Sequence, residues 1–335
     1  MSRLIHERFL LQSDEAVRLY YDYAAGQPII DYHTHLPPAE IAADRRWENI
    51  SQVWLNGDHY KWRQMRTNGI AERFCTGDAT DREKFDAFAS TLPYLLRNPL
   101  YHWCHLELAR YFQIDDLLLG PRTADEVWER SSAVFRNGLS ARSLIEKSNV
   151  LAVCTSDDPI DSLEHHAAVA ADPTFGARML PTWRPGRVLA LADPVSWNRY
   201  LDELGATADV EITSFDDLVA ALAVRCDVFH AAGCRLSDHA LVTGLFAPAS
   251  AQEVRASFDR LRSGAALPDA EQDQLATALL LQLGRLYREK GWTMQIRIGA
   301  LRDNNSAMLA ALGSDSGYDS LNRKRTKARA RPGSQ

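Results

Sequence analysis

The chain has 335 residues, of which 46% are hydrophobic and 24% charged, with a net charge of −6 at neutral pH. This composition is typical of globular proteins, and the length suits one large α/β domain or two smaller ones. The negative charge argues against general attraction to nucleic acid or membranes. The start MSRLIHERFL lacks a signal-peptide core, and five scattered cysteines without a CxxC pair favour a reducing compartment. We therefore expect a soluble cytoplasmic protein.

The first predicted elements are a helix and a short strand. Ser13 is placed to cap a helix over DEAVRLYYDYAA, which stops at Gly26. Two isoleucines then lead into a strand over residues 31–35 (DYHTH). Residues 1–35 are thus predicted to hold the N-terminal helix and the first strand.

A long stretch without strand character follows. Two capping boxes, Thr80-x-x-Glu83 and Thr123-x-x-Glu126, each precede an amphipathic run. We expect residues 36–145 to form a helical insertion after the first strand.

Beyond the insertion, apolar strands alternate with helices. The predicted strands are NVLAVCT, ARMLPTW, CRLSD and WTMQIRIGA, and the helix after the second of them should close at Gly205. Two further capping boxes, Ser214-x-x-Asp217 and Ser250-x-x-Glu253, begin helices between the strands. Apolar strands that alternate with helices indicate a parallel sheet covered by helices, with about five strands over the whole chain.

The chain ends in a basic segment, residues 321–335, where NRKRTKARARPGSQ contains six basic residues and no acidic one. It lacks apolar periodicity, so we expect it to be disordered. A tail that binds nucleic acid or a membrane is one interpretation. A solvated end is the more ordinary one, and we predict neither partner.

Two histidines, His33 and His35, end the first predicted strand. Residues i and i+2 of a strand face the same side, so both imidazoles can converge on one metal ion. The competing interpretation is that they only hydrogen-bond loop carbonyl groups. Imidazole pairs suit several divalent metals, so the pattern leaves the ion open.

Further polar groups are candidates for substrate contacts. The segment GDHYKWRQMR contains His59 and Tyr60, which can bind an anionic, hydroxylated substrate or transfer protons; an exposed helix start is the plainer interpretation. Arg184 and Asp238 follow predicted strands, and Arg297 lies within the last strand. Arginines suit a substrate carboxylate, and Asp238 suits a hydroxyl or proton transfer. Caps and ion pairs between loops are the alternatives.

Several motifs together resemble the uronate (glucuronate) isomerase family of the amidohydrolase superfamily. They are DYHTHL, GDHYKWRQMR, LRNPLYHWCHLEL, TSDDPIDSLEHH, LPTWRP, LSDHAL and GALRDNN, in that order over roughly residues 5–320. The resemblance implies an α/β fold, a distorted (β/α)8 TIM barrel with a helical insertion after strand 1. Residues 146–320 would then form a partial barrel, because this chain is short for eight strands.

The resemblance also implies a function and its residues. The reaction is aldose–ketose isomerisation of D-glucuronate to D-fructuronate, and of D-galacturonate to D-tagaturonate, through an enediolate in hexuronate catabolism. His33 and His35 would bind a divalent metal ion, Zn²⁺ in first place and Mn²⁺ in second. We predict proton transfer for Tyr60 and Asp238. We predict substrate binding for His59, Arg184, Arg297 and Arg302.

The chain departs from the family pattern in two places. Arg297 stands in MQIRIGA where the family has a histidine, and the basic tail stands where the family continues to a metal-binding aspartate. We therefore expect a chain truncated before the last strands. A metal-dependent amidohydrolase or lactonase and an inactive truncated remnant stay open as alternatives, and the sequence leaves assembly into homo-oligomers open.

Overall fold

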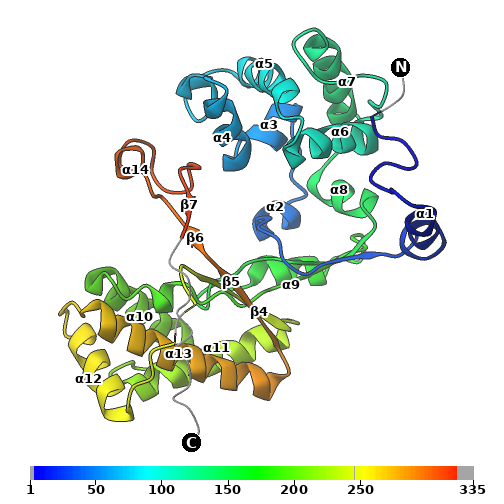
Figure 1. Cartoon of the computed structure of the whole chain (residues 1–335). Helices are drawn as coiled ribbons and strands as arrows, with labels where there is room; N and C mark the ends of the chain where they lie inside the picture. The colour runs from blue at the N-terminus through cyan, green and yellow to red at the C-terminus, as the bar shows by residue number, and fades with distance from the viewer. Residues whose placement is uncertain (1–3, 245, 323–335) are drawn as a thin grey trace, which may run out of the picture. The chain divides into compact units, whose positions relative to one another are not determined.

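The computed structural model describes residues 4–244 and 246–322, so most of the predicted basic tail lies outside the described residues (Figure 1). The chain divides into two compact units. Unit 1 comprises Met1–Ile30, Glu40–Leu151 and Arg302–Ser320, and unit 2 comprises Asp31–Ala39, Ala152–Leu301 and Leu321–Gln335. Each unit is therefore built from segments that are distant in the sequence.

Unit 1 is helical apart from strand ends. Its helices are α1 (Asp14–Leu19), the π-helical η1 (Tyr20–Ala24), α3 (Ile50–Leu55), α4 (His59–Thr67), η2 (Glu72–Phe74), α5 (Asp81–Thr91), η3 (Leu92–Tyr94), α6 (Pro99–Phe112), α7 (Ala124–Arg136), α8 (Ala141–Lys147) and α14 (Ser306–Leu312), and the short α2 (Pro38–Ala42) crosses the boundary between the units. Fully buried side chains, among them Ile50, Met65, Phe85, Phe88 and Leu108, form its core.

The predicted helix starts of unit 1 are confirmed in part. Ser13 caps α1, and Thr80 and Glu83 form the predicted capping box of α5. The box predicted at Thr123 is wrong, although α7 begins there. The Thr123 hydroxyl donates instead to the carbonyl oxygen of Leu118 at 2.6 Å, which takes it away from the helix start.

The strands of the described residues form three small sheets. Strands β1 (Ile29–Asp31), β2 (Val150–Cys154) and β3 (Arg178–Leu180) form one sheet in that order, and β4 (Leu236–Leu241) pairs with β5 (Thr293–Ile298) in parallel. Two-residue strands, β6 (Ala300–Leu301) and β7 (Ser320–Leu321), make a third. With the helices of unit 2, the strands give the predicted α/β class.

The chain beyond β3 connects the first two sheets. Pro181, which has no N–H group to donate, follows Leu180 directly and ends β3. Trp183 then makes isolated parallel bridges to Asp157 on one side and Ser237 on the other. Its indole is fully buried, so this crossing point is well anchored.

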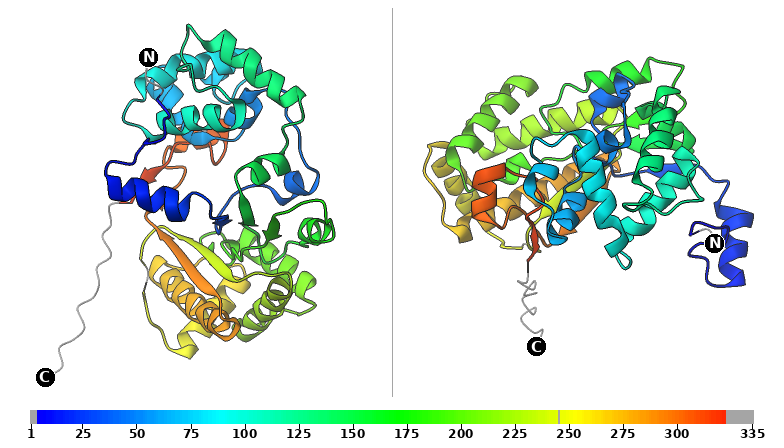
Figure 2. Two further views of the ribbon diagram at one scale, coloured as in Figure 1. Left: turned by 90° about the vertical axis from the view of Figure 1, so that its right-hand side faces the viewer. Right: turned by 90° about the horizontal axis from the view of Figure 1, so that it is seen from above.

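The helices of unit 2 are α9 (Glu164–Ala170), η4 (Arg187–Leu189), α10 (Pro194–Ala208), α11 (Phe215–Ala231), α12 (Ala251–Arg262) and α13 (Asp269–Lys290). Figures 1 and 2 show α10 to α13 gathered together beside the β4–β5 pair. The capping boxes at Ser214 and Ser250 are confirmed. No helix in the described ranges is both long and apolar enough to cross a membrane.

Two predicted boundaries in unit 2 are wrong. Helix α10 continues past Gly205 to Ala208. The glycine serves close packing, since a Cβ atom there would lie 2.7 Å from the Val210 carbonyl oxygen. The first strand ends at Asp31, so residues 32–35 are not part of it.

Candidate functional site

The histidine pair follows β1 in an irregular segment of unit 2. The amide of Thr34, between the two histidines, donates to the Cys154 carbonyl oxygen at 3.0 Å. The rings of His33 and His35 meet edge to face with centroids 4.9 Å apart. The argument from strand alternation is therefore wrong, but the two imidazoles do lie side by side.

The His33 ring is poised for a ligand. Both of its nitrogen atoms are buried and have no hydrogen-bond partner among residues 4–244 and 246–322. Burial lowers the pKa of His33, and the nearby arginines Arg297 and Arg184 act in the same direction. Burial, followed by Arg184, also lowers the pKa of His35. Both rings are thus neutral at physiological pH, the form that binds metals.

Asp238 lies at the centre of the polar groups of unit 2. Its side chain is fully buried on β4 and accepts two hydrogen bonds from Arg297, from Nε to Oδ1 at 2.8 Å and from Nη2 to Oδ2 at 2.5 Å. A second guanidinium, that of Arg184, places its Nε 3.6 Å from Oδ2. Burial alone would raise the pKa of Asp238, but the hydrogen bonds and charge of Arg297 outweigh it, so the pKa lies below its ordinary value.

The fit of this cluster to a metal ion is partial. His33 and His35 offer two neutral imidazoles, and the unpartnered nitrogens of His33 suit an ion. Over the residues with defined positions, no group of three or more His, Cys, Asp or Glu side chains could hold one. Asp238, a carboxylate whose charge acts on His33, is engaged by Arg297. The pair would therefore supply only two ligands, and no further described side chain completes the set.

The other predicted residues belong to unit 1, at the start of α4. Asp58 caps this helix by accepting from the amides of Tyr60 at 2.9 Å and Lys61 at 3.1 Å. The cap presents His59 and Tyr60 in the first turn, with ring centroids 4.3 Å apart. The Tyr60 side chain is exposed, whereas Nδ1 of His59 is buried and has no hydrogen-bond partner in the described part of the chain. An acceptor or donor from a ligand would satisfy that nitrogen.

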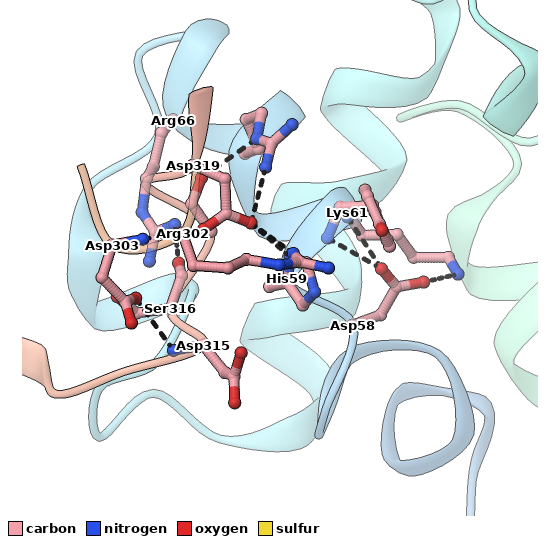
Figure 3. Close-up of polar contacts among 12 residues, drawn as sticks. Asp58, His59, Lys61, Arg66, Arg302, Asp303, Asp315, Ser316 and Asp319 are labelled. Atoms are coloured by element: carbon pink, nitrogen blue, oxygen red, sulfur yellow. Dashed lines mark hydrogen bonds and ion pairs between the residues drawn. The ribbon is translucent and has the colours of Figure 1, made fainter. Parts of the chain in front are cut away.

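Asp319 organises the polar groups around α4 (Figure 3). It accepts from Arg302 Nη1 at 2.6 Å and from the Asp303 amide at 3.1 Å, and its Oδ2 lies 4.0 Å from His59 Nδ1. Burial raises the pKa of Asp319, but the amide and Arg302 more than compensate, so the pKa is lowered. An ionised carboxylate thus fixes Arg302 beside His59.

The segment that carries Asp319 is attached to α4 through main-chain contacts as well. Arg63 donates from Nε to the Gly317 carbonyl oxygen at 3.0 Å, and Arg66 donates to the Ser316 carbonyl oxygen. Gly317 has a φ of +96°, and a Cβ atom there would lie 2.7 Å from the His59 carbonyl oxygen. Only glycine meets both conditions.

Sequence reasoning missed Asp319. The aspartate was visible only as part of DSGYDS, and nothing in its local pattern distinguishes it from a loop residue. Its partners include Arg63, which is 256 positions away in the sequence. No local signal reports a contact of that range.

Polar residues that follow β2 belong to a buried network in unit 2. The Thr155 hydroxyl lies 2.7 Å from both Asp157 Oδ2 and His166 Nε2, and the Thr182 amide donates to Asp157 at 3.1 Å. Burial raises the pKa of Asp157 to about 6 and lowers that of His166 to about 4. The carboxyl group of Asp157 therefore faces this network.

The predicted site residues thus fall into two groups. His33, His35, Arg184, Asp238 and Arg297 form a cluster in unit 2, here called the histidine–arginine cluster. His59, Tyr60 and Arg302 lie together in unit 1, joined by Asp319.

Comparisons with known proteins agree on one family. A family model described as glucuronate isomerase matches residues 1–331. The crystal structure of uronate isomerase from Thermotoga maritima superimposes with a TM-score of 0.91 at 32% identity, covering 96% of this chain and 70% of that one. Glucuronate isomerase from Caulobacter crescentus gives a TM-score of 0.86 at 27% identity, covering 95% and 68% respectively. The chain belongs to the glucuronate isomerase family.

Proposed function

We propose that the chain isomerises D-glucuronate to D-fructuronate, and D-galacturonate to D-tagaturonate, in hexuronate catabolism. Family membership supports this assignment. The observation that carries it in the structure is the buried Asp238 carboxylate flanked by two arginines and near a pair of neutral histidines. Such a group combines proton transfer with stabilisation of negative charge.

The reaction needs few functional groups. A proton leaves C2 and one is returned at C1, while the hydroxyl proton passes from O2 to O1, by way of an enediolate. Asp238 is ionised, so it can accept a proton, and the Tyr60 hydroxyl is an exposed donor. We assign proton transfer to these two residues.

The substrate also carries a carboxylate and hydroxyl groups that must be bound. Arg184 contacts both Asp238 and His35, yet its side chain is 35% exposed, so it retains donors for an anion. His59 and Arg302 are assigned to substrate contacts in unit 1, where Asp319 orients Arg302. Arg297, in unit 2, is assigned to the substrate carboxylate, although two of its N–H groups are already engaged by Asp238.

A divalent ion, with Zn²⁺ the first candidate and Mn²⁺ the second, would be held by His33 and His35. When bound, it would act as a Lewis acid that polarises a substrate oxygen. The partnerless nitrogens of His33 support this assignment.

We further propose that the strands belong to a distorted (β/α)8 barrel of amidohydrolase type. The parallel β2–β3 and β4–β5 pairs, with Trp183 bridging between them, support it. Residues 1–35, 36–145 and 146–320 would be the N-terminal part, the helical insertion and the barrel. A small hexuronate is the proposed partner, and the free thiols of all five cysteines are compatible with the proposed cytoplasmic location.

Ketose formation tests the function. The purified chain, supplied with Zn²⁺, is incubated with each uronate, and aldose and ketose are followed by NMR. We expect conversion of both substrates, with loss in Asp238→Asn. A folded chain that hydrolyses a sugar lactone but leaves both uronates unchanged would favour the hydrolase alternative instead.

A further inference from the structure

The histidine–arginine cluster contains more positive than negative charge. Two guanidinium groups, Arg184 and Arg297, lie beside one buried carboxylate, Asp238. Two permanent positive charges are therefore set against the single carboxylate that they contact. A divalent cation that approaches His33 meets this field.

Arg297 also occupies the carboxylate that a metal ion would otherwise use. Its guanidinium engages both oxygens of Asp238, and the pair is bidentate with good geometry. Register places Ala240 of β4 opposite Arg297, so the side chain reaches diagonally back to Asp238 on the neighbouring strand. Such a pair is held by the sheet itself and does not depend on a mobile loop.

The second arginine acts on His35. Arg184 Nη1 lies 3.4 Å from His35 Nδ1, and a guanidinium can only donate, so that nitrogen is the acceptor. The remaining ring proton of the neutral imidazole is then on Nε2. Both candidate ligands other than His33 are thus engaged by arginines.

We infer that Arg297 sets the metal affinity of this chain, keeping divalent ions weakly bound by holding Asp238 and by placing a permanent positive charge beside His33. The inference rests on the proposed assignment of His33 as a metal ligand. It predicts a site that gains affinity when the charge of Arg297 is removed, although no new ligand is introduced.

Calorimetric titration of Zn²⁺ into the metal-stripped full chain tests this. Arg297→Met removes the charge and the grip on Asp238, and we expect its dissociation constant to fall by at least about tenfold. Arg297→Lys keeps the charge and should remain close to the parent chain. Arg187→Met is the matched control, because Arg187 lies in the same unit but pairs with Glu203.

A buried Asp238 that has lost both hydrogen bonds from Arg297 can prevent folding of the Met variant. Arg297→Gln is the second variant, since its amide is neutral and still donates to the carboxylate; it should also bind Zn²⁺ more tightly. Equal affinities in the parent, Met and Gln proteins overturn the inference, as does a gain of the same size in Arg297→Lys. Circular dichroism confirms folding of each protein.

The variant His33→Ala separates the inference about Arg297 from the proposed metal-ligand role of His33. If it weakens Zn²⁺ binding while the Arg297 variants change nothing, the metal assignment holds and the inference fails. If His33→Ala leaves Zn²⁺ binding unchanged, the proposed metal ligand itself is wrong. Tighter binding in Arg297→Met that is lost again in the double variant with His33→Ala supports both.

Discussion

Arg297 and Asp238 form a bidentate ion pair between adjacent parallel strands, and the carboxylate in it has no exposed surface. Removing the arginine leaves the buried charge with the guanidinium of Arg184, 3.6 Å away, to compensate it. Such losses are larger than those of surface pairs, because the remaining charge stays desolvated.

Arg297→Gln should therefore lower the free energy of unfolding by about 2 kcal/mol, and combining it with Asp238→Asn should cost less than the two single changes added together. Denaturant titration of the parent chain, the two single variants and the double variant measures the coupling free energy between the two side chains. Strict additivity would show that the two side chains do not interact in solution.

Asp238→Asn should lower kcat for uronate isomerisation by at least about a hundredfold, because the amide cannot accept the proton. Asp193→Asn is the matched control. Asp193 caps α10 through its side chain, and asparagine caps equally well, so this variant should retain activity. Similar kcat values for the two variants would remove Asp238 from proton transfer.

Gly317→Ala should destabilise unit 1 more than Gly313→Ala does. Both glycines have positive φ, so both substitutions strain the backbone, but only at Gly317 would the new Cβ meet an atom, the His59 carbonyl oxygen. We expect a further loss of about 1 kcal/mol or more from that collision. Thermal denaturation compares the two, and equal losses would contradict the close approach to α4.

Protonation of His239 should lower the stability of the fold as the pH falls. Burial lowers its pKa to about 4, and Tyr287 lies 3.1 Å from its Nε2. A depressed folded-state pKa gives stability that is complete above the unfolded-state value of about 6.5 and is lost as pH falls towards about 4. Complete loss of this contribution would lower the free energy of unfolding by about 3 kcal/mol.

His239→Gln should therefore show a shallower loss of unfolding free energy between these pH values than the parent chain. His102→Gln serves as the control, because His102 is only partly buried on α6. Urea unfolding at several pH values gives the slopes. The raised pKa of Asp157 works in the opposite direction, so the comparison is made between variants and not on the parent curve alone.

Local patterns predicted local structure well. Serine and threonine caps at Ser13, Thr80, Ser214 and Ser250 depend on residues within one turn, and the structure has all four. Thr123 has the same pattern but a closer carbonyl partner in Leu118, which depends on how the preceding loop folds. Whether a capping box forms thus depends on competing hydrogen-bond partners, which the local sequence does not specify.

The residues of the candidate site were predictable, but several of the contacts between them were not. His33, Arg184 and Asp238 were identified because strand ends and the family motifs indicate them, although β1 ends before the histidines. The pairing of Arg297 with Asp238 depends on the β4–β5 register, and that of Asp319 with Arg302 on a turn in the segment that carries both. Contacts of this kind arise from tertiary packing, so no periodic pattern in the sequence indicates them.

The central claim is that this chain isomerises uronates, and NMR of D-glucuronate incubated with the purified, Zn²⁺-supplied chain tests it most directly. The account predicts D-fructuronate signals that grow to an equilibrium mixture, with kcat reduced in Asp238→Asn and retained in Asp193→Asn. A chain that is folded by circular dichroism but forms no ketose from D-glucuronate or D-galacturonate would contradict it.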